Sequence, residues 1–339
     1  MQLRNLLFVC LFVLVSCQSQ VQTENLVETE SNELLSPADA YLLEVFKIVE
    51  INALNRNEVD WSALKGKVFE REDDSASPSD VYDSVHYILQ NLNDQHSHFW
   101  DPSQANEFKT KAVDFSTEPW GKLVAGKYAY LWNGVFSSGN QDAINHYADQ
   151  LQQLVIDLDA QSPCAWVLDF RDNSGGTVFP MLAGSGELYG DGLAVIAVDS
   201  YGNTIEFNYE NGEFWEDGVS KAKASRPDFS LSEDQPTIAL LIGPRTASSG
   251  ELTVLAFEGI PNVVTFGHDT AGLTTANQTF ELSDGALLFL TTAVFGDRTG
   301  HTYGGKIMPD YPLSDSVTSN GTIPSEVMNW LEENSPCER

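Results

Sequence analysis

The sequence predicts an α/β fold with a helical subdomain ahead of it. Two short apolar runs, CAWVLDF and TIALLIGP, have the length of buried strands, and each leads through a turn of small residues into a helical pattern. Buried strands that alternate with helices are typical of α/β domains. Because the upstream part shows only helical periodicity, we expect a helical subdomain at 37–103 and an α/β domain at 104–339.

The first sixteen residues are typical of a secretion signal. Arg4 supplies the positive charge, and residues 6–15 form an apolar run too short to span a bilayer. The sequence LVSC, ending at Cys17, resembles the lipobox of bacterial lipoproteins, which implies cleavage before Cys17 and lipid attachment to its thiol. Gln18 implies, by the same resemblance, sorting to the outer membrane facing the periplasm. The alternative is a plain signal peptide with a chance cysteine.

Residues 17–36 are polar and acidic, with few large apolar side chains, and predict a disordered tether. Cys10 would be removed with the signal, and Cys17 would carry the lipid. Cys164 and Cys337 then remain, and an oxidising compartment favours one disulfide between them. Two free buried thiols are the alternative.

Two helices are predicted in the N-terminal subdomain. Ser36 has the character of an N-cap, and Pro37 suits the first helical position. The pair Ser77 and Pro78 repeats this signal. The second helix should end near Asn93, just before the sequence QHSHFW.

The α/β domain is expected to begin with two strands paired around Ala125 and Gly126. DAINHYADQLQQLVIDLDA reads as an amphipathic helix, and LAVIAVDSYGNTIEFNY as a hairpin that turns at 201–203. Gly259 should stop the helix that follows TIALLIGP. Further strands are expected at NVVTFG, TTANQTFEL and ALLFLTTAVF.

The net charge of −31 over 339 residues excludes some partners. So acidic a surface repels nucleic acid and anionic membranes, so we expect no nucleic-acid partner and membrane contact only through the lipid. Excess acid serves solubility more often than binding.

Ser248 and Ser249 stand where an apolar strand gives way to a helix. A serine at a helix start is usually only a cap. The same position also suits a nucleophile, because helix N–H groups and the positive end of the dipole can stabilise a developing oxyanion.

A second turn of interest holds Gly175 and Gly176, after the strand CAWVLDF. Glycines allow the positive φ that presents backbone N–H groups to an anion. A phosphate loop is the rival interpretation, but neither G-x-G-x-x-G nor a following Gly-Lys-Ser/Thr is present. A plain turn is the simplest alternative.

His96 and His98 follow the second predicted helix. They could act as a base or as two metal ligands. Because no third and fourth ligand of matching type lies nearby, we expect neither a metal nor a cofactor.

Three segments together resemble the tail-specific, or C-terminal processing, serine peptidase family over about residues 78–312. VLDFRDNSGGTVFPMLAG is similar to its D-L-R-x-N-x-G-G segment, TASSGE to its nucleophile segment, and the stretch ending in GGKIMPD to its closing segment. The resemblance implies a core like the β-spiral of crotonase and ClpP. The family's nucleophile lies three residues before a glutamate, which selects Ser248 over Ser249.

Two departures point to one branch of this family. Leu273 stands near the place of the lysine base that the better-known branch uses, and residues 103–120 leave no room for a PDZ module. The PDZ-lacking, histidine-using branch includes the tricorn core and interphotoreceptor retinoid-binding protein. Its D-G-H-T/S-like segment is similar to residues 94–97.

The resemblance implies a lipid-anchored serine-type endopeptidase that acts on peptides or proteins. Ser248 would attack the carbonyl and His96 would act as base, with activity rising through an ionisation near neutrality. Glu251 would orient His96 or a substrate amine, with Asp94 as the alternative.

Backbone N–H groups of Ser249, Gly175 and Gly176 would hold the oxyanion. A non-catalytic lipoprotein that binds peptides or hydrophobic ligands is the main alternative function, since the retinoid-binding relative shows that the fold can bind without proteolysis. An acyl-thioester enzyme is a further alternative, but the sequence has no nucleotide-binding feature.

Overall fold

The computed structural model describes residues 35–72, 76–111, 118–314 and 321–336, and the described residues from Ser36 onward belong to one compact unit. The predicted signal peptide, Cys17, the predicted tether up to residue 34 and Cys337 lie outside the described residues. Among the residues described, no helix combines the length and apolar character that crossing a membrane requires.

The chain begins with a helical region that starts where the sequence predicts. Ser36 Oγ accepts a hydrogen bond from the backbone N–H of Asp39 (3.0 Å), and Pro37 is the first helical residue. At the second predicted start, Ser77 N donates to Asp80 Oδ2 (2.9 Å), and a short 3-10 turn precedes the α-helix. The elements are α1 (Pro37–Asn52), η1 (Arg56–Glu58), α2 (Trp61–Arg71), η2 (Pro78–Val81) and α3 (Tyr82–Gln90).

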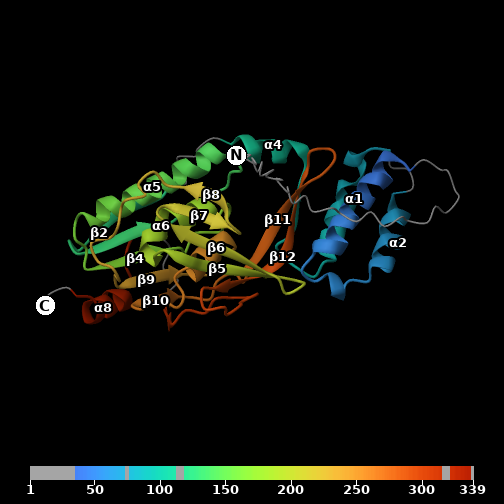
Figure 1. Cartoon of the computed structure of the whole chain (residues 1–339). Helices are drawn as coiled ribbons and strands as arrows, with labels where there is room; N and C mark the ends of the chain where they lie inside the picture. The colour runs from blue at the N-terminus through green and yellow to red at the C-terminus, as the bar shows by residue number, and fades with distance from the viewer. Residues whose placement is uncertain (1–34, 73–75, 112–117, 315–320, 337–339) are drawn as a thin grey trace, which may run out of the picture. The chain divides into compact units, whose positions relative to one another are not determined.

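The strands, all of which follow these helices in the chain, form two sheets (Figure 1). The six-stranded sheet has the order β13 (Tyr311–Pro312), β10 (Val263–Gly267), β9 (Ile238–Ile242), β4 (Ala165–Asp169), β3 (Tyr128–Trp132) and β2 (Trp120–Val124). The seven-stranded sheet has the order β1 (His98–Trp100), β12 (Leu287–Asp297), β5 (Gly192–Asp199), β6 (Thr204–Glu210), β7 (Glu213–Glu216) and β8 (Val219–Lys223), and β11 (Thr275–Glu281) also pairs with β12.

The central strands of the six-stranded sheet are parallel and covered on both faces. Alternate residues point to opposite sides: Trp166, Leu168 and Leu240 join the large cluster between the sheets, whereas Val167 and Leu241 join a second cluster beyond. The covering helices are α5 (Gln141–Asp159), α6 (Phe179–Tyr189) and α7 (Ser249–Leu255) on the first side and α8 (Ser325–Asn334) on the second. The predicted α/β fold with its helical N-terminal region is therefore confirmed.

The helical region packs against the long hairpin β11–β12 rather than against the parallel sheet. Figure 1 shows α1 and α2 beyond the end of this hairpin. Side chains of α1 and α3, including Leu42, Phe46 and Ile88, share one buried cluster with Leu288 and Leu290 of β12. The hairpin therefore belongs to both parts of the molecule and joins them.

Some segments differ from the sequence-based expectation. Residues 98–100 lie in the predicted helical subdomain, after its second predicted helix, and form strand β1, because they pair with β12 in register His98 to Phe289. Helix α4 (Pro102–Thr110), like β7 and β8, is not anticipated by the sequence patterns. Cys164 is disulfide-bonded, and because Cys337 lies outside the described residues, the pairing of these two cysteines stays a prediction.

Candidate active site

Ser248 lies at the N-cap of α7 with an unusual backbone conformation. Its φ is +52° and its ψ is −118°, a region that residues with a Cβ rarely adopt. The Ser248 N–H donates to Glu251 Oε2 (2.8 Å), which holds this conformation in place. Gly175 packs so closely that a Cβ there would come within 2.9 Å of Ser248 Cβ, so only glycine fits.

His96 contacts Ser248 directly. Its Nε2 lies 2.8 Å from Ser248 Oγ, although 152 residues separate them. Burial, and secondarily the charge of His98, lowers the pKa of His96 to about 4. The imidazole is therefore neutral at pH 7, the form that can accept a proton.

The other ring nitrogen of His96 contacts a residue that the sequence did not single out. Nδ1 lies 2.8 Å from Thr275 Oγ1, at the start of β11. A threonine in a strand-like stretch carries no signal of its own. The one available hint was position, because Thr275 lies two residues after Leu273, which stands near the place of the family's lysine.

Glu251 does not contact His96, whose orientation was one of the two roles expected for it. Its carboxylate is fully buried and accepts hydrogen bonds from Ser248 N, Gly272 N and Leu273 N (each 2.8 Å) and from the hydroxyl of Thr270. Burial raises the pKa of Glu251, and these hydrogen bonds oppose the rise. Glu251 therefore fastens the serine turn to the segment that leads into β11.

Asp94 does not contact the imidazole ring either. Its Oδ1 accepts hydrogen bonds from the backbone N–H groups of His96 (3.0 Å) and Ser97 (2.6 Å), which shapes the turn. Asn277 Nδ2 donates to the His96 carbonyl (2.9 Å), so β11 also holds the histidine backbone.

The predicted oxyanion donors differ in availability. The N–H of Gly175 already donates to Asn173 Oδ1 (3.0 Å), which counts against a role for Gly175 in holding an oxyanion. Within the described part of the chain, the N–H groups of Gly176 and Ser249 donate no hydrogen bond. Ser249 Oγ donates to the Gly176 carbonyl (2.6 Å) and keeps these two residues side by side.

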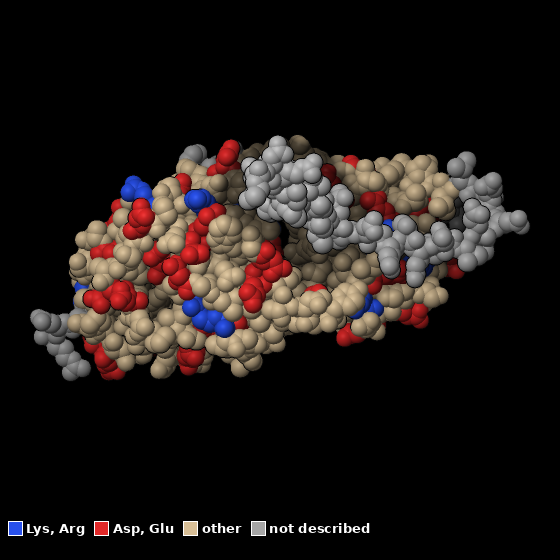
Figure 2. Space-filling view, in the orientation of Figure 1, with Lys and Arg blue, Asp and Glu red and all other residues tan. Residues whose placement is uncertain are grey.

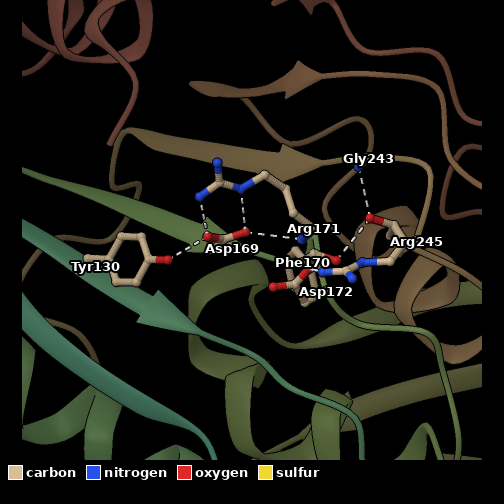
Figure 3. Close-up of polar contacts among 8 residues, drawn as sticks. Tyr130, Asp169, Phe170, Arg171, Asp172, Gly243 and Arg245 are labelled. Carbon is tan, nitrogen blue, oxygen red and sulfur yellow. Dashed lines mark hydrogen bonds and ion pairs between the residues drawn. The ribbon is translucent and has the colours of Figure 1, made fainter. Parts of the chain in front are cut away.

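The two turns that form the site are joined at the ends of β4 and β9 (Figure 3). Asp169 is fully buried and accepts from Arg171 Nε (2.9 Å) and Tyr130 Oη (2.5 Å). Thr246 Oγ1 donates to the Phe170 carbonyl (2.9 Å) and accepts from Gly243 N (2.9 Å). Thr246 therefore has a structural role, and it places the serine turn beside the glycine turn.

Ser248 and His96 open into a cavity of about 440 Å³. Part of the cavity wall is apolar. These side chains come from α6 and its N-cap, from α7 and from the seven-stranded sheet: Val178, Phe179, Phe207, Leu252 and Phe295.

Acidic side chains are spread over the face shown in Figure 2, with few basic ones between them. No group of three His, Cys, Asp or Glu side chains suited to hold a metal ion occurs in the described ranges.

The amino-acid sequence is similar to those of known proteins. Residues 129–313 match the sequence model of peptidase family S41. A nisin-resistance protein of Lactococcus lactis subsp. lactis is 36% identical over 195 residues, which are 58% of this chain and 57% of that protein. The chloroplastic carboxyl-terminal-processing peptidase 2 of Arabidopsis thaliana is 30% identical over 180 residues, 52% of this chain and 30% of that protein. The matches thus span less than two thirds of both relatives.

Among solved structures, a lipoprotein from Streptococcus agalactiae superposes with a TM-score of 0.73. It is 24% identical and the match covers 90% of this chain and 99% of that one. At this identity the likeness is one of fold.

Proposed function

The chain belongs to peptidase family S41, and from this we propose that it is a serine-type peptidase with Ser248 as nucleophile and His96 as general base. The observation that carries the proposal is the 2.8 Å contact between His96 Nε2 and Ser248 Oγ inside a cavity. A nucleophile and a base within hydrogen-bond distance are the signature of covalent acyl transfer.

The first half of the reaction forms an acyl-enzyme. Neutral His96 accepts the hydroxyl proton at Nε2 while Ser248 Oγ attacks the carbonyl carbon of the substrate. The resulting oxyanion is held by the N–H groups of Gly176 and Ser249, neither of which donates to another acceptor among the described residues. His96 then gives its proton to the leaving amine. In the second half, His96 activates a water molecule that hydrolyses the ester.

Thr275 is a positioning residue in this mechanism. For Nε2 to accept a proton, the neutral ring must carry its hydrogen on Nδ1, and Thr275 Oγ1 at 2.8 Å is the acceptor there. A hydroxyl stabilises the imidazolium less than a carboxylate would. The low pKa of His96, about 4, comes mainly from burial of the ring and agrees with an uncharged residue, Thr275, as its partner at Nδ1.

The substrate is proposed to be a peptide outside the cytoplasm. The likeness to a nisin-resistance protein makes nisin a first candidate to assay. We also propose anchoring to the cell envelope through a lipid on Cys17, which the lipoprotein among the structural neighbours supports. The outer-membrane and periplasmic placement inferred from Gln18 has no support from these relatives, which are from Gram-positive bacteria, and is not proposed further.

A fluorophosphonate probe tests the nucleophile. The wild-type protein should be labelled on Ser248, and Ser248→Ala should lose both labelling and peptide hydrolysis. Ser249→Ala should keep labelling, because the substitution retains the Ser249 N–H. An unlabelled wild-type protein, or a labelled Ser248→Ala protein, would refute the proposal.

A further inference from the structure

Four aromatic rings form one connected cluster on the histidine side of the cavity. His98 stacks on Phe289 with centroids 4.5 Å apart, and Trp100 meets Phe289 edge-on at 4.6 Å. Phe108 of α4 lies 5.2 Å from Trp100 and 5.8 Å from Phe289. All four rings line the cavity that contains Ser248 and His96. We refer to these four residues as the aromatic wall.

The aromatic wall is not part of the hydrophobic core. Core rings such as Phe214 are fully buried, whereas every ring of the wall is only half-buried. On β1, the side chain between His98 and Trp100 is Phe99, which points the other way and packs in the helical region. The strand therefore uses one face for folding and turns two rings toward the cavity. Apolar surface left open inside a concave site is typical of a ligand-binding wall.

The position of the aromatic wall relative to Ser248 indicates which part of a substrate it contacts. His96 protonates the leaving amine, so the segment that follows the scissile bond lies on the His96 side. The wall begins two residues after His96 and includes the partner of His98 across β12. The proposed oxyanion donors Gly176 and Ser249 also line this cavity, together with Leu252 and Phe179.

A second cavity continues from the aromatic wall. It has a volume of about 280 Å³, shares Trp100, Phe108 and Ser137 with the first, and is also lined by Gln104, Glu107 and Lys111. A chain that crosses the wall would therefore continue into a more polar environment. This gives room for residues beyond the one that follows the scissile bond.

We propose that the aromatic wall binds the side chain immediately after the scissile bond and selects an aromatic or large aliphatic residue there, in a substrate that continues past that residue. The inference rests on the proposed peptidase function. Stacking and edge-on contacts with several rings would discriminate such a side chain from a small polar one by roughly tenfold or more.

The test is a competition between two internally quenched peptides that differ only in having Phe or Ser after the cleaved bond. Mass spectrometry of the products identifies the bond, and the ratio of the two kcat/KM values does not depend on the fraction of folded enzyme. The wild type should prefer Phe by at least about tenfold. Trp100→Ala and Phe108→Ala should bring the ratio within about threefold of one, and Trp100→Phe should keep most of it.

Trp120→Ala is the matched control. Trp120 is an exposed tryptophan in a ring cluster, with its ring centroid 5.4 Å from that of Tyr130, and it lies on β2 and does not line the cavity. Its substitution should leave the ratio unchanged. Two outcomes would overturn the role of the aromatic wall while leaving the peptidase proposal in place. One is a wild-type enzyme that is labelled and cleaves both peptides without preference; the other is an unchanged preference in Trp100→Ala and Phe108→Ala. A wild-type protein with neither labelling nor cleavage would instead refute the peptidase proposal.

Discussion

The two segments that meet at the site, 243–251 and 94–98, are held in different ways. The serine segment lies at the end of a parallel sheet, where Thr246 and Glu251 are fully buried and Ser249 nearly so. The histidine segment is half-buried throughout residues 96–98. It is held by the β11–β12 hairpin, through the Asn277 side chain, which donates to the His96 carbonyl, and the Thr291 N–H, which donates to Ser97 Oγ. Buried residues of the core therefore fix the position of Ser248, whereas the position of His96 depends on hydrogen bonds with the β11–β12 hairpin.

This contrast predicts different signatures for variants on the two sides. A change on the serine side should lower both the stability of the fold and the activity. A change on the histidine side should lower activity with little loss of stability, since few buried contacts are removed. The predictions below test that contrast.

His96→Ala should have the largest effect. It removes the base while the core stays intact, so kcat/KM should fall by about 10³-fold or more with the thermal midpoint nearly unchanged. His146→Ala, an exposed histidine on α5, is the control and should be neutral. A His96→Ala protein with near-normal activity would show that another group acts as base.

The pH dependence of wild-type activity tests the burial of His96. Only the neutral imidazole accepts a proton, so kcat/KM should be level above the pKa and fall about tenfold per pH unit below it. Burial moves that pKa from an ordinary 6.5 to about 4, so the fall should begin at acidic pH and not near neutrality. The folded state should also lose stability as pH falls from 6.5 toward 4, because the unfolded chain binds the proton first. An inflection in kcat/KM near 6.5 would contradict the buried environment.

Glu251→Gln should damage both properties. The amide would face backbone N–H groups that now donate to carboxylate oxygens, leaving buried donors without acceptors. Unfolding free energy should fall by about 2–3 kcal/mol, and kcat by roughly tenfold to a hundredfold as the Ser248 turn loosens. Glu333→Gln, on the exposed side of α8, is the control. Unchanged stability with lost activity would place Glu251 in the chemistry instead.

Local signals in the sequence predicted the serine side better than the histidine side. The apolar runs of β4 and β9, and the small residues after them, indicate Ser248 or Ser249 and the pair Gly175 and Gly176 as candidates, and the family resemblance then selects Ser248. By resemblance, the S-x-x-E spacing selects Ser248, and Glu251 is expected to orient His96 or a substrate amine. In the structure the Glu251 carboxylate instead accepts from the Ser248 N–H. The Glu251 carboxylate also accepts hydrogen bonds from residues 270–273, and no local sequence pattern indicates that these residues fold beside it.

Thr275 lay beyond prediction for a similar reason. Its contact with His96 spans 179 residues, and the segment TTANQTFEL had only the pattern of a strand. Likewise, residues 98–100 form the short strand β1 because they pair with β12, whereas the sequence alone places them in the predicted helical subdomain.

Thr275→Val should lower kcat by about tenfold without a matching loss of stability. Valine keeps the shape but leaves Nδ1 of His96 without an acceptor, so the productive tautomer is less favoured. Thr275→Ser restores the hydroxyl and should recover most of the rate. If serine did not rescue the valine defect, Thr275 would be acting through packing and not through the hydrogen bond.

Arg56→Ala should give the smallest effect, and it tests a second connection between the helical region and the core. The Arg56 guanidinium lies 3.4 Å above the ring of Tyr201 at the tip of the β5–β6 hairpin, and its Nη1 donates to Ser200 Oγ (2.6 Å). The contact is exposed, so its loss should cost about 1 kcal/mol or less. The hydrogen bonds to His96 come from β11 and not from the tip of the β5–β6 hairpin. We therefore expect kcat to change by less than about threefold. A large fall in kcat with unchanged stability would show that the hairpin tip also sets the position of the base.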